Sequence, residues 1–213
     1  MPDAHDVDET RFTMLETVRE YGLERLAASG ELERARAAHA TYVLDLVERA
    51  APRLIGAEQS LWLARLERER DNARAALDWA REQGDLEHGL RLAGALWRFW
   101  YTRGYVAEGR ARLEGFLALV TSDGPTVAAP VRAKALYRAA VLAAEQSDYD
   151  RAVILAEESA ALHRALDDAP GLAAALTVLG GGARYQSDTT ARPRCSSRSW
   201  TSIGPSETGQ AAP

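Results

Sequence analysis

The sequence predicts an all-α protein built as a stack of antiparallel helical hairpins. Ala, Leu, Arg and Glu dominate its 213 residues, whereas Phe occurs 3 times and Met 2 times. This composition favours helices and leaves few aromatic and β-branched side chains for strands. Apolar residues also recur with a helical period from Glu16 to Gln186, and short turn signals separate the successive segments. Consecutive helices joined by such turns become antiparallel neighbours.

Three helices are expected in the first part of the chain. They span Glu16 to Ser29, Glu31 to Ala50 and about Ala57 to Gln83, and a glycine or proline follows each of them. These residues are typical helix stops. On each helix the apolar positions fall near one face, which we expect to point inward. The inward positions are Val18, Tyr21, Leu23 and Leu26 in the first helix, Tyr42, Val43, Leu46 and Val47 in the second, and Leu61, Trp62, Leu66, Ala73, Leu77 and Ala80 in the third.

Five more helices are expected after Gly84. They span Leu86 to Gly104, Ala107 to Val120, Arg132 to Gln146, Tyr149 to Leu166 and Leu172 to Gln186. The stretch from Thr121 to Pro130 is rich in Gly, Pro and Ser and is therefore expected to be a linker.

The turns of this second part repeat at nearly constant spacing. Gly104 precedes Ser147 by 43 positions, and Ser147 precedes Ser187 by 40. The helices before the last two turns also match, with Leu136 opposite Leu176. A period of this length with two helices per unit is typical of a tetratricopeptide-type (TPR) repeat, slightly longer than the usual one. The predicted fold is therefore a TPR-like solenoid.

Charge and composition exclude several classes of function. The formal net charge is -5, and acidic and basic residues alternate without forming a basic stripe, so we expect no nucleic-acid binding by this chain alone. The single cysteine, Cys195, provides neither a disulfide nor a cysteine-based zinc site. No signal peptide and no apolar run long enough for a membrane span are visible, and we expect a cytoplasmic protein with no membrane partner.

Several segments resemble one family, the large multidomain ATP-binding bacterial regulators that include LuxR-type activators. The resemblance lies in RFTMLETVREYGLERLAASGE, LARLERERDNARAALDWAREQGD, LRLAGALWRFWYTRGYVAEGRARLE and DYDRAVILAEESAAL. It covers about Arg11 to Asp188. Members of this family join a nucleotide-binding module, a winged helix and a TPR-like sensor array. The first segment is similar to the place where the last strand of the winged helix passes into the following helix.

The chain departs from this family in two ways. It contains no GxxxxGK[ST] phosphate loop and no visible C-terminal helix-turn-helix. What the family does through ATP and DNA therefore does not carry over to these residues, and the resemblance implies the sensor or interaction role alone. The chain is accordingly divided into a winged-helix remnant with its linking helix (1–29), a helical array (30–120), a linker (121–131), TPR-like repeats of which the last is incomplete (132–188), and a tail (189–213).

The tail has no helical period and is rich in Ser, Thr, Arg, Gly and Pro, a composition typical of disorder. The third repeat would need a second helix at this place. When the tail is back-translated and read one base earlier, the frame permits Tyr-Asp-Arg-Ala, the residues that follow the preceding turn at Tyr149 to Ala152. We interpret the tail as a frameshifted end of the repeat, and the alternative is a native extension.

Candidate site residues are few. The four histidines are scattered without metal-ligand spacing, Gly180 to Gly182 lack the strand and lysine of a phosphate cradle, and Asp148 with Asp150 falls in a turn. No catalytic, cofactor or metal residue is therefore assigned, and no enzyme activity is expected. The possible ligand or partner surface is aromatic, since aromatic side chains suit binding pockets, although core packing between hairpins explains the same spacing more simply. Its residues are Trp97, Trp100, Tyr101 and Tyr137.

Three functional hypotheses remain. In the first, the chain is a non-catalytic module that binds a protein partner or a small effector, as solenoids generally do. In the second, it is a truncated, non-functional relic of a longer regulator. In the third, the remnant from Arg11 to Ser29 binds DNA, although it lacks the preceding helices that a recognition element requires.

Overall fold

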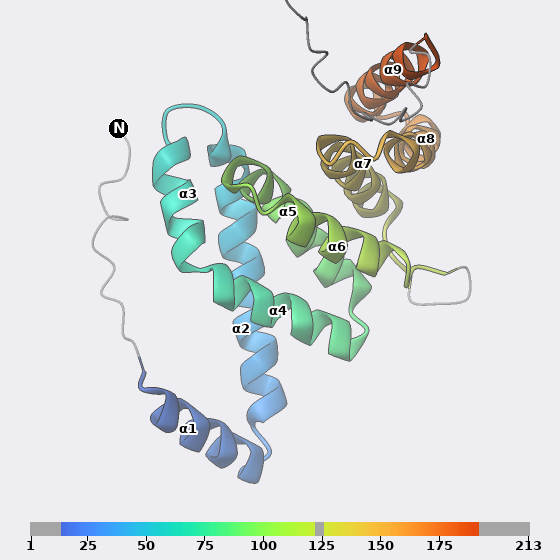
Figure 1. Ribbon diagram of the computed structural model, residues 1–213. Helices are drawn as coiled ribbons and strands as arrows, with labels where there is room; N and C mark the ends of the chain where they lie inside the picture. Colours follow the sequence, from blue (N-terminus) through green and yellow to red (C-terminus); the bar gives the residue numbers. More distant parts are fainter. Residues whose placement is uncertain (1–13, 122–125, 192–213) are drawn as a thin grey trace, which may run out of the picture.

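The computed structural model describes residues 14–121 and 126–191, with side chains up to residue 181. Within these residues the chain is helical and contains no strand, which confirms the predicted all-α class. The elements, drawn in Figure 1, are α1 (Glu16–Ala28), α2 (Leu32–Ala50), the 3-10 helix η2 (Ala51–Leu54), α3 (Gln59–Arg68), α4 (Arg70–Gln83), α5 (Leu86–Arg103), α6 (Val106–Leu117), α7 (Ala129–Glu145), α8 (Tyr149–Ala165) and α9 (Ala169–Ala191).

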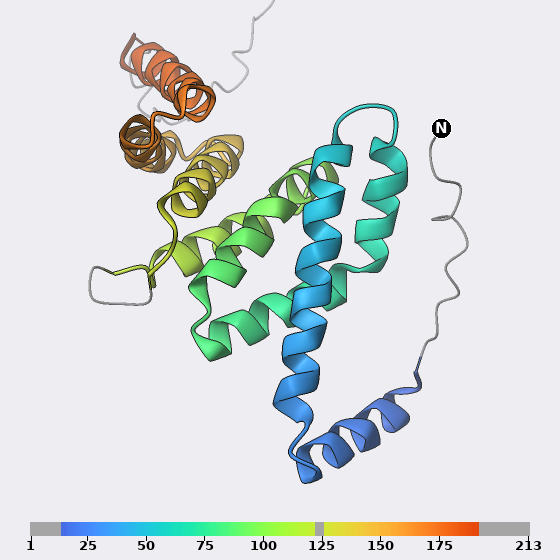
Figure 2. The same cartoon turned by 180° about the vertical axis from the view of Figure 1, so that it is seen from behind.

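Helix α5 is central in the arrangement. It packs against α2, α4, α6 and α7, so that it joins the N-terminal helices to the C-terminal ones. From α5 onward each helix packs against the next, and α5 also meets α7 just as α7 meets α9. Figures 1 and 2 show α7, α8 and α9 continuing to one side of the first six helices.

The turns between hairpins owe their shape to glycine and aspartate. Gly84 and Gly104 end α4 and α5 in the left-handed region, with φ of 69° and 80°, which residues with a Cβ rarely adopt. After two of the turns, aspartates cap the following helix: Asp85 accepts a hydrogen bond from the backbone N–H of His88, and Asp148 from that of Arg151. The helices therefore end and begin at the glycine and aspartate residues that mark turns in the sequence.

The helix expected from Ala57 to Gln83 is broken. It divides at Glu69, whose φ of -95° and ψ of 3° end α3 and begin α4. The two halves differ in their main partners, because α3 packs chiefly against η2 and less against α2, whereas α4 packs against α2 and α5. The expectation of one continuous helix from Ala57 to Gln83 was therefore wrong.

The expected inward face of α1 is exposed. Val18, Tyr21 and Leu23 lie in solvent and Leu26 is only partly covered, so that no residue of this helix is buried. Figures 1 and 2 show α1 at the far end of α2, away from the other helices. The apolar period was read correctly as a helix, but among the described residues α1 has only a small contact with α2, which leaves most of that face exposed.

The proposed winged-helix remnant is not confirmed. Met14 and Leu15 precede α1 and belong to no strand, although the backbone of Leu15 is extended, while Arg11 to Thr13 lie outside the described residues. The tail expectation also falls mostly outside them, since α9 runs to Ala191 and residues 192–213 are not described. Helix α9 thus continues beyond Gln186, where the sequence predicted its end.

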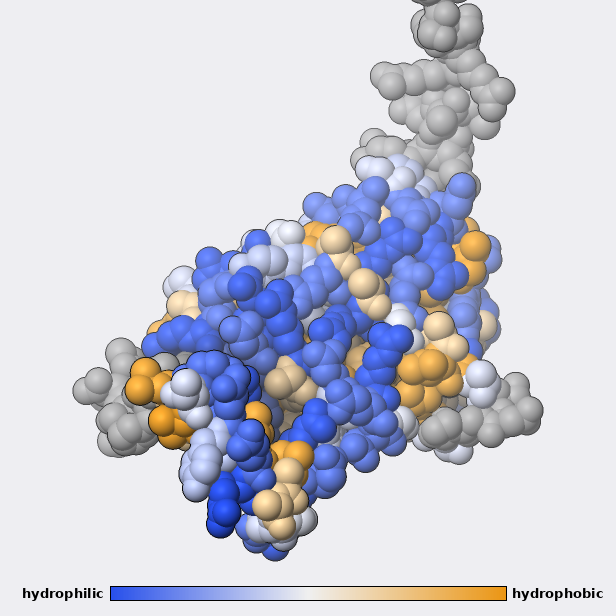
Figure 3. Space-filling model, turned by 60° about the horizontal axis from the view of Figure 1, so that its bottom comes forward, coloured by the Kyte–Doolittle hydropathy of each residue, from blue (hydrophilic) through white to orange (hydrophobic). Residues whose placement is uncertain are grey.

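One hydrophobic core runs through the described helices from α2 to α8. Most of the inward positions named from the sequence belong to it, but Tyr42 and Leu61 are exposed because they stand at the edges of the apolar stripes of α2 and α3. The largest fully buried side chains are Phe99, Leu46, Leu54, Leu66, Leu77, Leu90, Leu92, Leu113, Leu136, Leu142, Leu155 and Val43. The face in Figure 3 is largely hydrophilic with small separate apolar patches, as expected for mixed charges on solvated helix faces.

Candidate partner-binding groove

Three of the four aromatic residues singled out from the sequence meet between α5 and α7. The Trp97 ring lies 6.3 Å, centroid to centroid, from Tyr101 and 6.3 Å from Tyr137, the latter edge-on. Arg98 places its guanidinium 4.6 Å from the centroid of Trp97, in a cation-π contact. Trp97, Tyr101 and Tyr137 form what we call the aromatic cluster. Trp97 and Tyr137 are partly buried, whereas Tyr101 is 43% exposed.

Trp100, the fourth residue, does not join the cluster. It is 2% exposed and packs against Gly109 of α6, where a Cβ would lie 2.5 Å from its Cε3 atom. For Trp100 the core interpretation is therefore confirmed. Trp97, Tyr101 and Tyr137 pack against one another and also contact solvent. Their positions are therefore compatible both with core packing and with binding of a ligand or partner.

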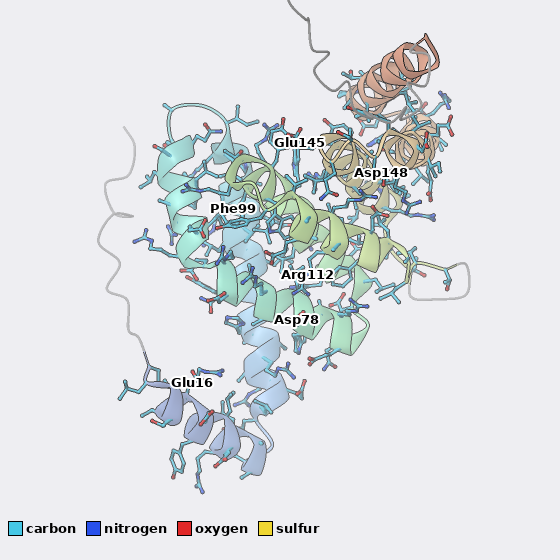
Figure 4. The ribbon with its side chains drawn as sticks, viewed as in Figure 1. Glu16, Asp78, Phe99, Arg112, Glu145 and Asp148 are labelled. Carbon is cyan, nitrogen blue, oxygen red and sulfur yellow. The ribbon has the colours of Figure 1, made fainter. Side chains whose placement is uncertain are left out.

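The exposed side of Tyr101 opens into a groove of about 370 Å³ between α5, α7, α8 and α9. Small residues of α7, α8 and α9 keep it open, while Tyr101, Tyr149 and Glu145 add polar side chains to its lining. Figure 4 labels Glu145 at the C-terminal end of α7. The groove is lined by Tyr101, Val141, Ala144, Glu145, Ser147, Tyr149, Ala152, Val178 and Gly181.

An ion-pair network holds one end of this groove in place. Arg110 of α6 donates from Nε to Glu114 at 2.6 Å and from Nη2 to Asp148 at 2.5 Å, and it also reaches Gln146. Arg151 of α8 donates to the second oxygen of Glu114 at 2.8 Å. The network therefore joins α6 to the turn between α7 and α8, labelled by Asp148 in Figure 4.

The network also perturbs its carboxyl groups. Burial raises the pKa of Glu114, but the hydrogen bonds from Arg110 and Arg151 outweigh burial and the net pKa is lowered. The hydrogen bond from Arg110 lowers the pKa of Asp148 as well. Sequence reasoning had noticed Asp148 only as a turn residue, because nothing in the local pattern points to an arginine 38 positions earlier.

The geometry of the described residues contains no group of three or more His, Cys, Asp or Glu side chains that could hold a metal ion. Nor is any helix among them long and apolar enough to cross a membrane. The groove offers hydroxyl groups, one carboxylate and apolar walls, a combination suited to holding a ligand in position.

The amino-acid sequence of the chain is similar to those of three proteins named as transcriptional regulators. The chain is 33% identical over 186 residues to proteins of Mycobacterium bovis and of two strains of Mycobacterium tuberculosis. All three carry the name HTH-type transcriptional regulator. The chain is similar to these regulators. The match covers 85% of this chain but 21% of each relative, so the chain spans about a fifth of their length.

Other comparisons add nothing to this similarity. No protein-family model matches the sequence, and no solved structure matches it. The regulator-derived origin expected from the sequence agrees with the names of the relatives. Their names do not speak to the LuxR-type and ATPase features that the resemblance implied.

Proposed function

We propose that this chain is a non-catalytic, TPR-like module of a signal-responsive cytoplasmic transcriptional regulator, and that its groove binds a protein partner or a small effector. The similarity to longer mycobacterial regulators supports the regulator part of this proposal. The module occupies about a fifth of such a protein, and DNA binding belongs to other parts of it. The formal net charge of -5 is consistent with that division of labour.

The packing of the helices supports the TPR-like interpretation. In a solenoid of hairpins, each helix contacts the next one, and the first helices of adjacent hairpins also meet. The contacts of α5 with α7 and of α7 with α9 follow this scheme. Buried alanines bring α7 and α8 close together; they are Ala133, Ala135, Ala139, Ala140 and Ala143 on α7 and Ala152, Ala156 and Ala160 on α8.

The exposure of Tyr101 carries the binding part of the proposal. A tyrosine whose ring contacts Trp97 and whose side chain lines a groove offers a large contact area at small cost in side-chain entropy. Tyrosines of this kind are enriched at the centres of protein interfaces. A partner segment seated in the groove would cover Tyr101 and the apolar wall formed by Val141 and Val178.

The test uses peptides that tile the parts of a mycobacterial relative outside the aligned fifth. Binding to the 213-residue chain is measured by fluorescence anisotropy of labelled peptides. We expect at least one peptide to bind saturably and Tyr101→Ala to weaken it by about 2 kcal/mol, as at an interface hot spot. Tyr42→Ala is the matched control, because Tyr42 is 49% exposed on α2, outside the groove.

The same experiment separates the other hypotheses. A parallel titration with metabolite mixtures covers the small-effector case. It is followed by tryptophan fluorescence, and Trp97→Phe identifies the part of the change that arises at Trp97, beside Tyr101. Titration with labelled duplex DNA covers the DNA-binding case, which predicts saturation without dependence on Tyr101. If nothing binds in any titration, the proposal is wrong and the relic hypothesis takes its place.

A further inference from the structure

A second cavity lies on another side of α5 and is lined by charge of one predominant sign. It has a volume of about 280 Å³ and lies between α2, α5 and α7. Three cationic side chains line it, Arg91, Lys134 and Arg138, against a single carboxylate, Glu48. It shares no residue with the groove around Tyr101.

The single carboxylate is already engaged. Arg91 of α5 donates from Nε to one oxygen of Glu48 at 2.9 Å and from Nη2 to the other at 2.7 Å. This two-bond geometry uses both oxygens of Glu48 and neutralises Arg91. The positive charges of Lys134 and Arg138 are left without a matching charge among the residues that line the cavity.

Arg138 is the more unusual of the two. Its Nη1 atom lies 2.4 Å from the position that a Cβ on Gly94 would take, so the guanidinium rests on the bare backbone of α5. Burial lowers the pKa of Arg138. Among the described residues it forms no ion pair, whereas Arg74, Arg91 and Arg112 each pair with a carboxylate on another helix and Arg110 pairs with Asp148 in the turn before α8.

The placement of Lys134 adds to this imbalance. It stands four positions before Arg138 on the same face of α7, where two like charges repel each other. Lys134 is exposed and forms no ion pair with Asp168 among the described residues. Its charge is the weakest of the causes that lower the pKa of Asp168. The first turn of α7, with Val131, also borders the cavity, and the positive end of the helix dipole favours an anion there.

We propose that this cavity binds a small organic anion, whose carboxylate or phosphate group is held between Arg138 and Lys134. A guanidinium beside an ammonium suits either group, because both present oxygens in a geometry that arginine matches with two hydrogen bonds. Leu90, Ala95 and Val131 offer an apolar wall for the body of the ligand. The volume suits a metabolite smaller than most drug-sized ligands.

The test measures binding of succinate and of glycerol phosphate to the 213-residue chain by isothermal titration calorimetry at constant ionic strength. We expect saturable binding of one ligand per chain for at least one of them, and the comparison tells carboxylate from phosphate. Arg138→Met keeps an unbranched apolar stem and removes the guanidinium with its charge, and it should weaken binding on the order of tenfold to a hundredfold. Arg164→Met, which changes an exposed arginine of α8 outside the cavity, should bind as the unchanged protein does.

A second readout guards against misfolding of the variant. In chloride buffer without the ligand, Arg138→Met should melt no lower than the unchanged protein, because it removes a partly buried charge that has no partner. Val131→Glu should also abolish binding, since it places a carboxylate of the chain itself one turn from Lys134. The proposal is overturned if neither succinate nor glycerol phosphate binds saturably at millimolar concentration, or if both variants bind as tightly as the unchanged protein.

Discussion

Gly109 of α6 lies directly against the indole of Trp100 on α5. A Cβ on Gly109 would fall 2.5 Å from Cε3 and 2.7 Å from Cδ2 of that ring. Trp100 is buried, so its ring has little space into which it could move. The absence of a side chain at Gly109 therefore sets how closely α5 and α6 approach each other.

We expect Gly109→Ala to destabilise the protein by about 1 to 3 kcal/mol, the usual cost of an overpacked core. Gly115→Ala is a matched control in the same helix, because the nearest atom to its added Cβ would be 3.8 Å away. There the alanine should stabilise by up to about 1 kcal/mol through its helix propensity. Urea unfolding followed by circular dichroism measures both, and equal effects would contradict the close contact.

The two neighbouring tryptophans should differ in their contributions to stability. Trp100→Ala should lower the free energy of unfolding by about 3 to 5 kcal/mol, since it removes a fully buried ring. Trp97→Ala should cost about 1 to 2 kcal/mol, because Trp97 is only partly buried. The sequence had predicted both to be mostly buried, and the structure confirms this for Trp100 alone. Thermal melts of the two variants would contradict the assignment if Trp97→Ala were the more damaging.

Stability should depend on pH through the pair formed by Arg74 of α4 and Glu108 of α6. Arg74 donates to both oxygens of Glu108, at 2.6 and 2.7 Å, and this hydrogen bonding lowers the pKa of Glu108. A lowered carboxyl pKa stabilises the fold above the unfolded-state pKa, and this contribution is lost as the pH falls through the folded-state pKa. Acid should therefore remove the contribution of the pair.

Glu108→Gln tests this expectation. At pH 7 it should cost about 1 kcal/mol, a figure reduced for solvent screening because the Arg74 side chain is 39% exposed. Below the pKa of Glu108 the variant and the unchanged protein should have nearly equal stability, since both then carry a neutral side chain. Glu24→Gln on the exposed surface of α1 serves as control at both pH values. A difference that persists unchanged in acid would show that packing, and not charge, is responsible.

Amide hydrogen exchange should be much faster in α1 than in α5. Helix α1 buries no residue, whereas α5 buries ten, so α1 opens without disrupting the core. Removal of residues 1–30 should accordingly leave the melting temperature within about 2 °C of that of the full chain. Mass spectrometry after exchange resolves the two helices. Protection of α1 equal to that of α5 would mean that its apolar face is covered in solution, for instance by a second copy of the chain.

Local sequence signals predicted the helices and most of their ends, because a helix depends on its own apolar period and on the residues that stop it. Gly84 and Gly104 end helices as expected, and Asp148 caps α8. The division at Glu69 was not predicted, because no glycine or proline marks it. The break separates α3, which packs mainly against η2, from α4, which packs against α2 and α5, and the apolar period of one helix does not encode such partners.

For the candidate sites as well, the sequence predicted residue types but not which residues meet in the folded protein. Trp97, Tyr101 and Tyr137 could be named from their aromatic character, but their meeting across α5 and α7 depends on how the hairpins pack. The pocket around Arg138 gave no signal in the sequence, since an arginine on a charged helix is ordinary until its partners are known.

The sequence by itself determined the helical class, the succession of hairpins and the excess of negative charge, because these follow from composition and from spacing along the chain. The tertiary structure decided which apolar faces are covered, that Trp100 rather than Trp97 is fully buried, and that the partly buried Arg138 forms no ion pair among the described residues. Those properties depend on contacts between residues 30 to 50 positions apart, such as Arg91 with Glu48 or Arg74 with Glu108. Burial and charge pairing are properties of neighbours in space, and the order of residues along one helix does not contain them.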